Sequence, residues 1–173
     1  MDKVLIFTAT FNEIDNISQL IEKIKQNCES ADILIIDDNS PDGTGELLKN
    51  LENQDRNLKV IIRDKKYGLD TAHKFAYNYA LKNHYDYLIT MDADFSHDPS
   101  EIPNFLNNIS NHDVVLGSRY MKGGKNELTM HRFLLSYFGN KFIKKILKLK
   151  SSEFTVKVDS ATPSTVNTLE LDR

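Results

Sequence analysis

Short apolar runs that alternate with longer amphipathic stretches constrain the fold of this chain more than any other feature of its sequence. Each run has the length of a strand, and apolar residues recur with helical spacing in the segment after it, as Ile17, Leu20 and Ile24 do after the first run. Buried strands separated by helices predict an α/β fold of Rossmann-like type, with a mostly parallel sheet and helices on both faces. The expected strands are residues 4–7, 33–36, 58–62, 87–91 and 114–116.

Polar and charged side chains follow these runs at the points where the strands are expected to end. Ligands of a parallel sheet normally bind beyond the carboxyl ends of its strands, so we expect the functional site at that edge. The residues there are Asn12 and Glu13 after the first strand, Asp37 and Asp38 after the second, Asp92 and Asp94 after the fourth, and Arg119 after the fifth.

The overall composition fits one globular domain. The chain has 173 residues, of which 40% are hydrophobic and 27% are charged, and these values are ordinary. A formal net charge of −3 argues against sequence-independent binding of nucleic acid. The single Cys28 cannot form an intrachain disulfide, and no apolar run approaches the roughly 18 residues of a membrane span. We therefore expect a cytoplasmic protein with no nucleic-acid partner.

The composition changes in the C-terminal third, which divides the chain into three expected parts. Residues 1–125 carry the alternating pattern, residues 126–155 form a basic amphipathic segment, and residues 156–173 form an atypical tail rich in Ser and Thr. In the middle part, side chains such as Phe142 and Lys144 suit contact with an anionic membrane surface. They are equally typical of an ordinary helix whose lysines are solvated, so both interpretations stay open.

The turn expected after the fourth strand carries two carboxylates one residue apart, Asp92 and Asp94, followed by Ser96. Hard oxygen ligands of this kind suit Mg²⁺ or Mn²⁺, which can in turn bind a substrate diphosphate. Asp also caps helices and fills turns, and for an isolated Asp-x-Asp that interpretation would be preferred. The position of this pair after a buried strand of a parallel sheet favours a metal site.

A second polar cluster follows the second strand, where Asp37 and Asp38 precede the turn-forming residues 39–43. Two consecutive carboxylates at a strand end need solvent, a cation or hydrogen-bond donors, and the base or ribose of a nucleotide supplies such donors. The chain has no Gly-rich phosphate-binding motif, so metal and Arg would have to hold phosphate. Asp42 and Asp98 are interpreted as turn or helix caps, and all five histidines as structural.

In combination, these motifs resemble the family-two glycosyltransferases of the GT-A fold, and within them the dolichyl-phosphate and polyprenyl-phosphate mannosyltransferases. The resemblance covers about residues 3–155. Several motifs in the right order are far more specific than any one of them alone. The matching segments are Thr10–Glu13, Ile36–Thr44, Arg63–Ala72, Met91–Pro99 and Gly117–Tyr120.

The resemblance implies which residues bind the nucleoside part of a nucleotide-sugar. Ala9, Phe11 and Glu13 would line the nucleotide pocket. Ile36 and Asp38 would lie at the base and ribose. The family usually has Pro and Tyr where this chain has Ala9 and Phe11, so the details of the pocket differ.

The resemblance also implies which residues meet the diphosphate and the metal. Asp92, Ala93 and Asp94 would contact both, and Ser96 would add an oxygen ligand to the metal. Arg119 would contact phosphate, although an Arg there is also suited to pair with an Asp at the sheet edge. Asp94 and Arg119 would be the catalytic residues.

The function implied by the resemblance is the inverting, metal-dependent transfer of a sugar to a polyprenyl (dolichyl) phosphate. The donor would be GDP-mannose or UDP-glucose, and the cofactor Mg²⁺ or Mn²⁺. A lipid acceptor would bring the protein to the cytoplasmic face of a membrane as a peripheral protein. Two alternatives stay open: a glycosyltransferase with a sugar-hydroxyl acceptor, and a nucleotide-binding fragment without turnover.

Overall fold

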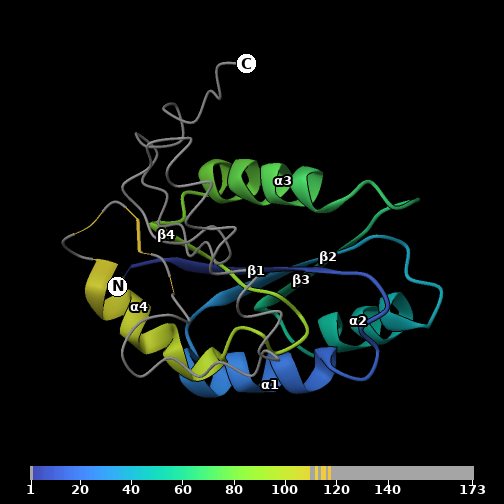
Figure 1. Cartoon of the computed structure of the whole chain (residues 1–173), viewed down its shortest axis with the longest axis horizontal. Coiled ribbons are helices and arrows are strands. Elements are labelled where there is room, and N and C mark those ends of the chain that lie inside the picture. Colours follow the sequence, from blue (N-terminus) through green and yellow to red (C-terminus); the bar gives the residue numbers. More distant parts are fainter. Residues whose placement is uncertain (1, 110–111, 113, 116, 118–173) are drawn as a thin grey trace, which may run out of the picture. The chain divides into compact units, whose positions relative to one another are not determined.

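Parallel strands form the framework of this protein, whose computed structural model describes residues 2–109, 112, 114, 115 and 117 (Figure 1). The strands are β1 (Val4–Thr10), β2 (Asp32–Asp37), β3 (Leu58–Ile62) and β4 (Tyr87–Thr90). They form a four-stranded sheet in the order β3-β2-β1-β4, and all neighbouring strands are parallel. β1 therefore pairs on both of its edges.

Helices connect the strands and cover both faces of the sheet, which confirms the expected fold class. Figure 1 shows α1, α2 and α4 on one face and α3 on the other. In the part of the chain that the structure describes, no helix combines the length and the apolar character needed to cross a membrane. The helices are α1 (Ile17–Asn27), α2 (Thr44–Glu52), α3 (Leu69–Lys82), the short 3-10 helix η1 (Pro99–Glu101) and α4 (Ile102–Ile109).

Successive side chains of the strands alternate between two hydrophobic layers. In β1, Ile6 packs in the layer that contains α1, and Phe7 packs in the layer beneath α3. Both side chains are almost fully buried. Ala72, Ala76 and Ala80 form the buried face of α3, and these small side chains let the helix approach the sheet closely.

The strand boundaries differ in places from those expected. β1 continues beyond its apolar run because its backbone stays paired with β2 as far as Thr10, opposite Asp37. β4 ends at Thr90, one residue earlier than expected. Within the described residues, the expected fifth strand is represented by a β-bridge at Val115, and Leu116 lies outside them.

The expected helix start at Asp98 is confirmed. Its carboxylate accepts a hydrogen bond from the backbone N–H of Ser100 at 3.0 Å, and Pro99 occupies the first helical position. Proline suits this position because the missing N–H would have no partner within the helix. The first turn is the 3-10 helix η1, which continues directly into α4.

Glu52, at the end of α2, fastens this helix to β3. Its carboxylate accepts a hydrogen bond from the Val60 N–H at 2.9 Å and forms ion pairs with Lys49 at 2.8 Å and Lys59 at 3.1 Å. Burial raises the pKa of this carboxyl group, but its donors outweigh that effect and lower the pKa to about 2. Glu52 is therefore anionic at pH values at which an unfolded Glu is protonated.

We expect Glu52→Gln to destabilise the protein in a pH-dependent way. Because the pKa is lower in the folded state, the carboxylate stabilises the fold above its ordinary pKa of 4.5, and this stabilisation is lost as the pH falls toward about 2. At pH 7 the variant should lose about 1–2 kcal/mol of unfolding free energy, measured by urea titration. The loss should shrink as the pH is lowered to 3. The control is Glu46→Gln, a change of an exposed residue on the same helix. A loss of stability in Glu52→Gln that does not depend on pH would contradict the stabilising role of the Glu52 carboxylate.

Candidate active site

The candidate site lies at the carboxyl edge of the sheet, where the strand order reverses. From β1 the chain adds β2 and then β3 on one side, and it later adds β4 on the other side of β1. In open parallel sheets, ligands bind outside the carboxyl ends of the strands at such a reversal. The loops after β1, β2 and β4 carry Glu13, Asp38 and Asp92, so these predicted residues lie at one edge.

The turn after β4 presents two exposed carboxylates, Asp92 and Asp94, with Ser96 between them in space. The Ser96 N–H donates to Asp94 at 2.9 Å, and its hydroxyl donates to Asp92 over a longer distance, 3.4 Å. Ala93 is buried, and Phe95 has a left-handed backbone with φ 61°. This tight turn brings together the three residues predicted as metal ligands and leaves both carboxylates in solvent.

The chemistry of this turn suits a divalent cation. Partial burial raises the pKa of Asp94, but hydrogen bonds, chiefly from the Ser96 backbone N–H, outweigh this effect and hold the pKa below its ordinary value. Asp94 is therefore anionic at neutral pH.

Within the described ranges, no three His, Cys, Asp or Glu side chains form a group able to hold a metal. Mg²⁺ is commonly held by one or two carboxylates together with substrate phosphates, and Asp92 and Asp94 fit a site of that kind. Their metal binding stays a prediction.

His97 lies against Asp92, in a contact that agrees with the interpretation of this histidine as structural. The Asp92 backbone N–H donates to Nδ1 of His97 at 3.0 Å. The other ring nitrogen, Nε2, lies 3.6 Å from an oxygen of the Asp92 carboxylate. The two residues are five positions apart in the sequence, but this spacing alone does not predict the contact. His97 holds the backbone of this turn beside its first carboxylate.

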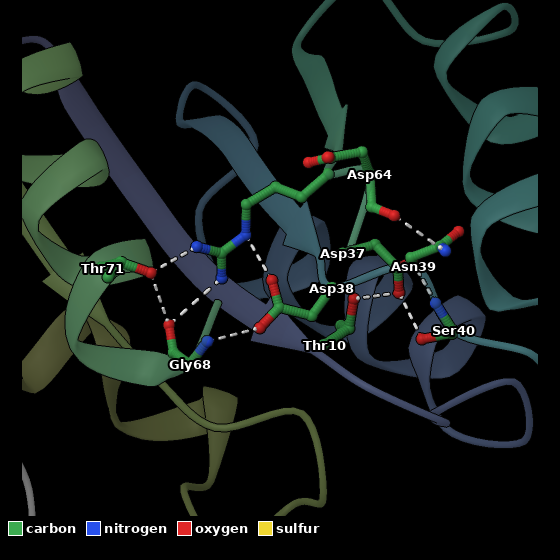
Figure 2. A network of polar contacts seen from close by, with 9 residues as sticks. Thr10, Asp37, Asp38, Asn39, Ser40, Asp64, Gly68 and Thr71 are labelled. Atoms are coloured by element: carbon green, nitrogen blue, oxygen red, sulfur yellow. Dashed lines mark hydrogen bonds and ion pairs between the residues drawn. The ribbon is translucent and has the colours of Figure 1, made fainter. Parts of the chain in front are cut away.

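Asp37 is fully buried and has its partners inside the protein (Figure 2). One oxygen accepts hydrogen bonds from the hydroxyls of Thr10, at 2.9 Å, and Ser40. The other oxygen accepts from the Ser40 N–H at 2.9 Å. The Ser40 hydroxyl in turn accepts from the Asn12 N–H at 2.9 Å. Asp37 therefore ties the loop after β2 to the loop after β1.

Asp38 faces a different set of partners (Figure 2). It forms an ion pair with Nε of Arg63 and accepts a hydrogen bond from the Gly68 N–H at 3.0 Å. The sequence contained Arg63 within a matching segment, but no local pattern linked it to Asp38. A carboxylate predicted to bind a nucleoside is thus already held by two donors from the segment between β3 and α3.

The loop after β1 contains two further predicted residues. Phe11 is exposed, and the Lys66 ammonium lies 3.6 Å from its ring centroid. Glu13 is half-buried, and its N–H donates to the Thr44 hydroxyl at 3.0 Å. Asp42 accepts from the Thr44 N–H at 3.0 Å, which confirms its interpretation as a cap. These contacts join the loop after β1 to the start of α2.

The remaining predicted residues are less exposed or lie outside the description. Ala9 is half-buried near the end of β1. Ile36 is 1% exposed in the layer beneath α3, and its contact with the base and ribose stays a prediction. Arg119 lies outside the described residues, as do residues 126–155 and 156–173.

Solved glycosyltransferase structures share this architecture. A mannosyltransferase from Pyrobaculum calidifontis, in complex with GDP-Man and Mn²⁺, matches with a TM-score of 0.55 at 15% identity, over 91% of this chain and 50% of that one. Glucosyl-3-phosphoglycerate synthase from Mycobacterium tuberculosis, in complex with Mn²⁺, UDP and glucosyl-3-phosphoglycerate, matches with a TM-score of 0.51 at 18% identity, over 80% of this chain and 51% of that one. At such identity the likeness shows the fold alone, and it confirms the expected GT-A architecture.

Several curated proteins are similar in sequence. The undecaprenyl-phosphate mannosyltransferase of Micrococcus luteus is 31% identical over 98% of this chain and 70% of its own length. The polyprenol monophosphomannose synthase of Mycolicibacterium smegmatis is 32% identical over 88% of this chain and 59% of its own. The dolichol-phosphate mannosyltransferase of Pyrococcus furiosus is 37% identical over 72% of this chain and 35% of its own. The chain thus spans between 35% and 70% of the length of these relatives.

The family itself follows from a match that covers most of the chain. Residues 5–161 match the model described as glycosyl transferase family 2. This range includes all of the strands except Val4 at the start of β1, together with the acidic turn after β4 and the Asp38 network described above. The chain therefore belongs to glycosyl transferase family 2.

Proposed function

We propose that this chain provides the donor site of a polyprenyl-phosphate hexosyltransferase. The reaction is the inverting transfer of mannose or glucose from GDP-mannose or UDP-glucose to a polyprenyl (dolichyl) phosphate, with Mg²⁺ or Mn²⁺ as cofactor. The observation that carries the proposal is the pair of exposed carboxylates, Asp92 and Asp94, directly after β4. They lie at the reversal of strand order, where an open parallel sheet binds a nucleotide.

The comparisons support the acceptor, the sugar and the metal. The names of the three relatives each combine mannose with a phosphorylated isoprenoid lipid, which is derived from undecaprenol, polyprenol or dolichol. Two structural neighbours hold Mn²⁺, one with GDP-Man and the other with UDP. A divalent metal and a nucleotide-diphosphate donor are consistent with the two anionic side chains that this chain presents.

In this proposal, each strand end holds one part of the donor. Asp38 accepts hydrogen bonds from the nucleoside, beside the pocket residues at the end of β1. Asp92, Asp94 and Ser96 would hold the metal, whose charge would stabilise the negative charge of the diphosphate leaving group. Arg119 adds a phosphate contact. We place this donor-binding core within residues 1–125.

The acceptor needs no general base from the protein. A phosphate monoester has a second pKa near 6, so its oxygen is anionic at neutral pH. This oxygen attacks the anomeric carbon as the bond from that carbon to the diphosphate oxygen breaks. Attack from the face opposite the leaving group inverts the configuration. A sugar hydroxyl would instead have to lose a proton to a base.

A lipid acceptor requires the enzyme to work at a membrane surface. We propose that residues 126–155, which lie outside the described residues, make a peripheral contact with the cytoplasmic face of the membrane. Their sequence combines aromatic side chains with lysines, which are the components of an interfacial amphipathic helix. Residues 156–173 have no role in this proposal.

We expect Asp94→Asn to abolish metal-dependent binding of the donor. The change keeps an oxygen that can accept from Ser96 but removes the negative charge aimed at the cation. Calorimetry with GDP-mannose and UDP-glucose, with and without Mn²⁺, should show a fall in affinity of more than about tenfold for the favoured donor.

Asp86→Asn is the matched control, because this exposed Asp precedes β4 at the opposite edge of the sheet. It should bind the donor as the wild type does. Full Mn²⁺-dependent affinity in Asp94→Asn would overturn the metal assignment. A wild-type chain that binds neither donor would overturn the proposed function.

Vesicle sedimentation tests the membrane contact. If residues 126–155 lie on the bilayer, the chain should bind anionic vesicles, and binding should weaken when salt is raised. Each Lys near an anionic surface contributes about 1 kcal/mol, so replacing Lys144, Lys145 and Lys148 with Glu should remove most of the binding.

The control replaces three exposed lysines of the described residues, Lys23, Lys74 and Lys82, with Glu. It changes the net charge by the same amount and should leave vesicle binding largely intact. Negligible sedimentation of the wild type at low salt would contradict the proposed contact.

A further inference from the structure

A polar network joins the ends of β2 and β3 to the start of α3, with the Asp38 carboxylate at its centre (Figure 2). Three guanidinium nitrogens of Arg63 take part. Nε pairs with Asp38, and the other two donate to the Thr71 hydroxyl and, at 3.2 Å, to the Gly68 carbonyl. The Gly68 N–H donates to the second oxygen of Asp38 at 3.0 Å. Arg63 and Asp38 are thus both held by the backbone of Gly68, Arg63 by its carbonyl and Asp38 by its N–H.

The backbone around Asp38 is held to the same strand end. The Arg63 N–H donates to the carbonyl of Asp37 at 2.9 Å. The side chain of Asn39 donates to the carbonyl of Asp64 at 3.2 Å (Figure 2). The residues before and after Asp38 are therefore both tied to the end of β3, so movement of this end would also move the carboxylate.

The ion pair is largely removed from water. The side chains of Arg63 and Asp38 are 14% and 8% exposed. A buried ion pair is a poor source of stability, because the cost of desolvating both charges offsets much of their attraction. In other proteins, replacement of a buried ion pair by well-packed apolar residues is often neutral or stabilising. The use of a charged pair here therefore points to a role in orienting the carboxylate.

Asp38 keeps capacity for a ligand while it is held in this way. An ionised carboxylate offers about four acceptor positions, and the described contacts of Asp38 use one on each oxygen. Because Oδ1, which pairs with Arg63, is buried, a nucleoside N–H or O–H donor would bind at the remaining position of Oδ2. A fixed acceptor binds such donors at a lower entropic cost than a mobile one.

We propose that Arg63 is a positioning residue for nucleoside recognition, which fixes the orientation of the Asp38 carboxylate through its fork of contacts to Gly68 and Thr71. The inference rests on the proposed function, in which Asp38 binds the nucleoside. Lysine cannot replace Arg63 in this role, because a single ammonium cannot reproduce the planar set of donors. Arg63 acts on the nucleoside part of the donor and leaves the metal and diphosphate part unchanged.

Arg63→Lys is the main test, because it keeps the positive charge beside the buried Asp38 and so avoids an unpaired carboxylate. Affinities for GDP, UDP and pyrophosphate are measured by calorimetry with Mn²⁺. The variant should bind the preferred nucleoside diphosphate about tenfold more weakly and pyrophosphate as the wild type does. Amide hydrogen exchange at Gly68 should be faster in the variant even without ligand.

Thr71→Val provides a second variant that keeps the ion pair and removes one contact of the guanidinium. It should show a smaller loss in the same direction. Arg56→Lys is the matched control, because the exposed Arg56 lies before β3, at the far end of that strand. It should change neither affinity. Urea unfolding of each variant shows whether the protein is folded under the binding conditions.

The outcomes separate this inference from the proposed function. A wild type that binds neither GDP nor UDP would overturn the proposed function and this inference with it. A wild type that binds one of them, together with an Arg63→Lys variant that binds it equally well, would overturn this inference alone. Equal losses for nucleoside diphosphate and pyrophosphate would also overturn it, because they would indicate general damage to the site.

Discussion

The pairing of β1 on both of its edges is the constraint on which the rest of the structure depends. Its backbone is in register with β2 as far as Thr10 opposite Asp37, and with β4 as far as Phe7 opposite Thr90. Because all these strands are parallel, the loops that follow them leave from one edge of the sheet. Carboxylates that are far apart in the sequence therefore meet at that edge without any local signal that links them.

The alternation of side chains along β2 gives its two terminal carboxylates different roles. Ile33 and Ile35 belong to the layer that contains α1, and Leu34 and Ile36 belong to the layer beneath α3. With a period of two, Asp37 follows the first pair. It is buried against Thr10 and Ser40, where it stabilises the loops. Asp38 follows the second pair, so it meets the start of α3 and the Arg63 guanidinium.

The acidic groups of the site also differ in how their charge is balanced. The charge of Asp38 is matched by Arg63 in a largely buried pair. Asp92 and Asp94 are exposed, and among residues 2–109 no Lys or Arg forms an ion pair with them. Balanced charge suits recognition of a neutral nucleoside by hydrogen bonds. Unbalanced charge suits a cation and the diphosphate that it carries.

The sequence by itself determined the α/β class, most of the strands and helices, and the edge of the sheet at which the candidate site residues lie. These features depend on local periodicity and on the general geometry of parallel sheets. The cap at Asp98 was equally local, because its partner Ser100 is two residues away. Only the tertiary structure decided which partners hold the acidic residues. The contact of Arg63 with Asp38 depends on the pairing of β2 with β3, and the contact of His97 with Asp92 depends on a left-handed turn, so neither follows from spacing along the chain.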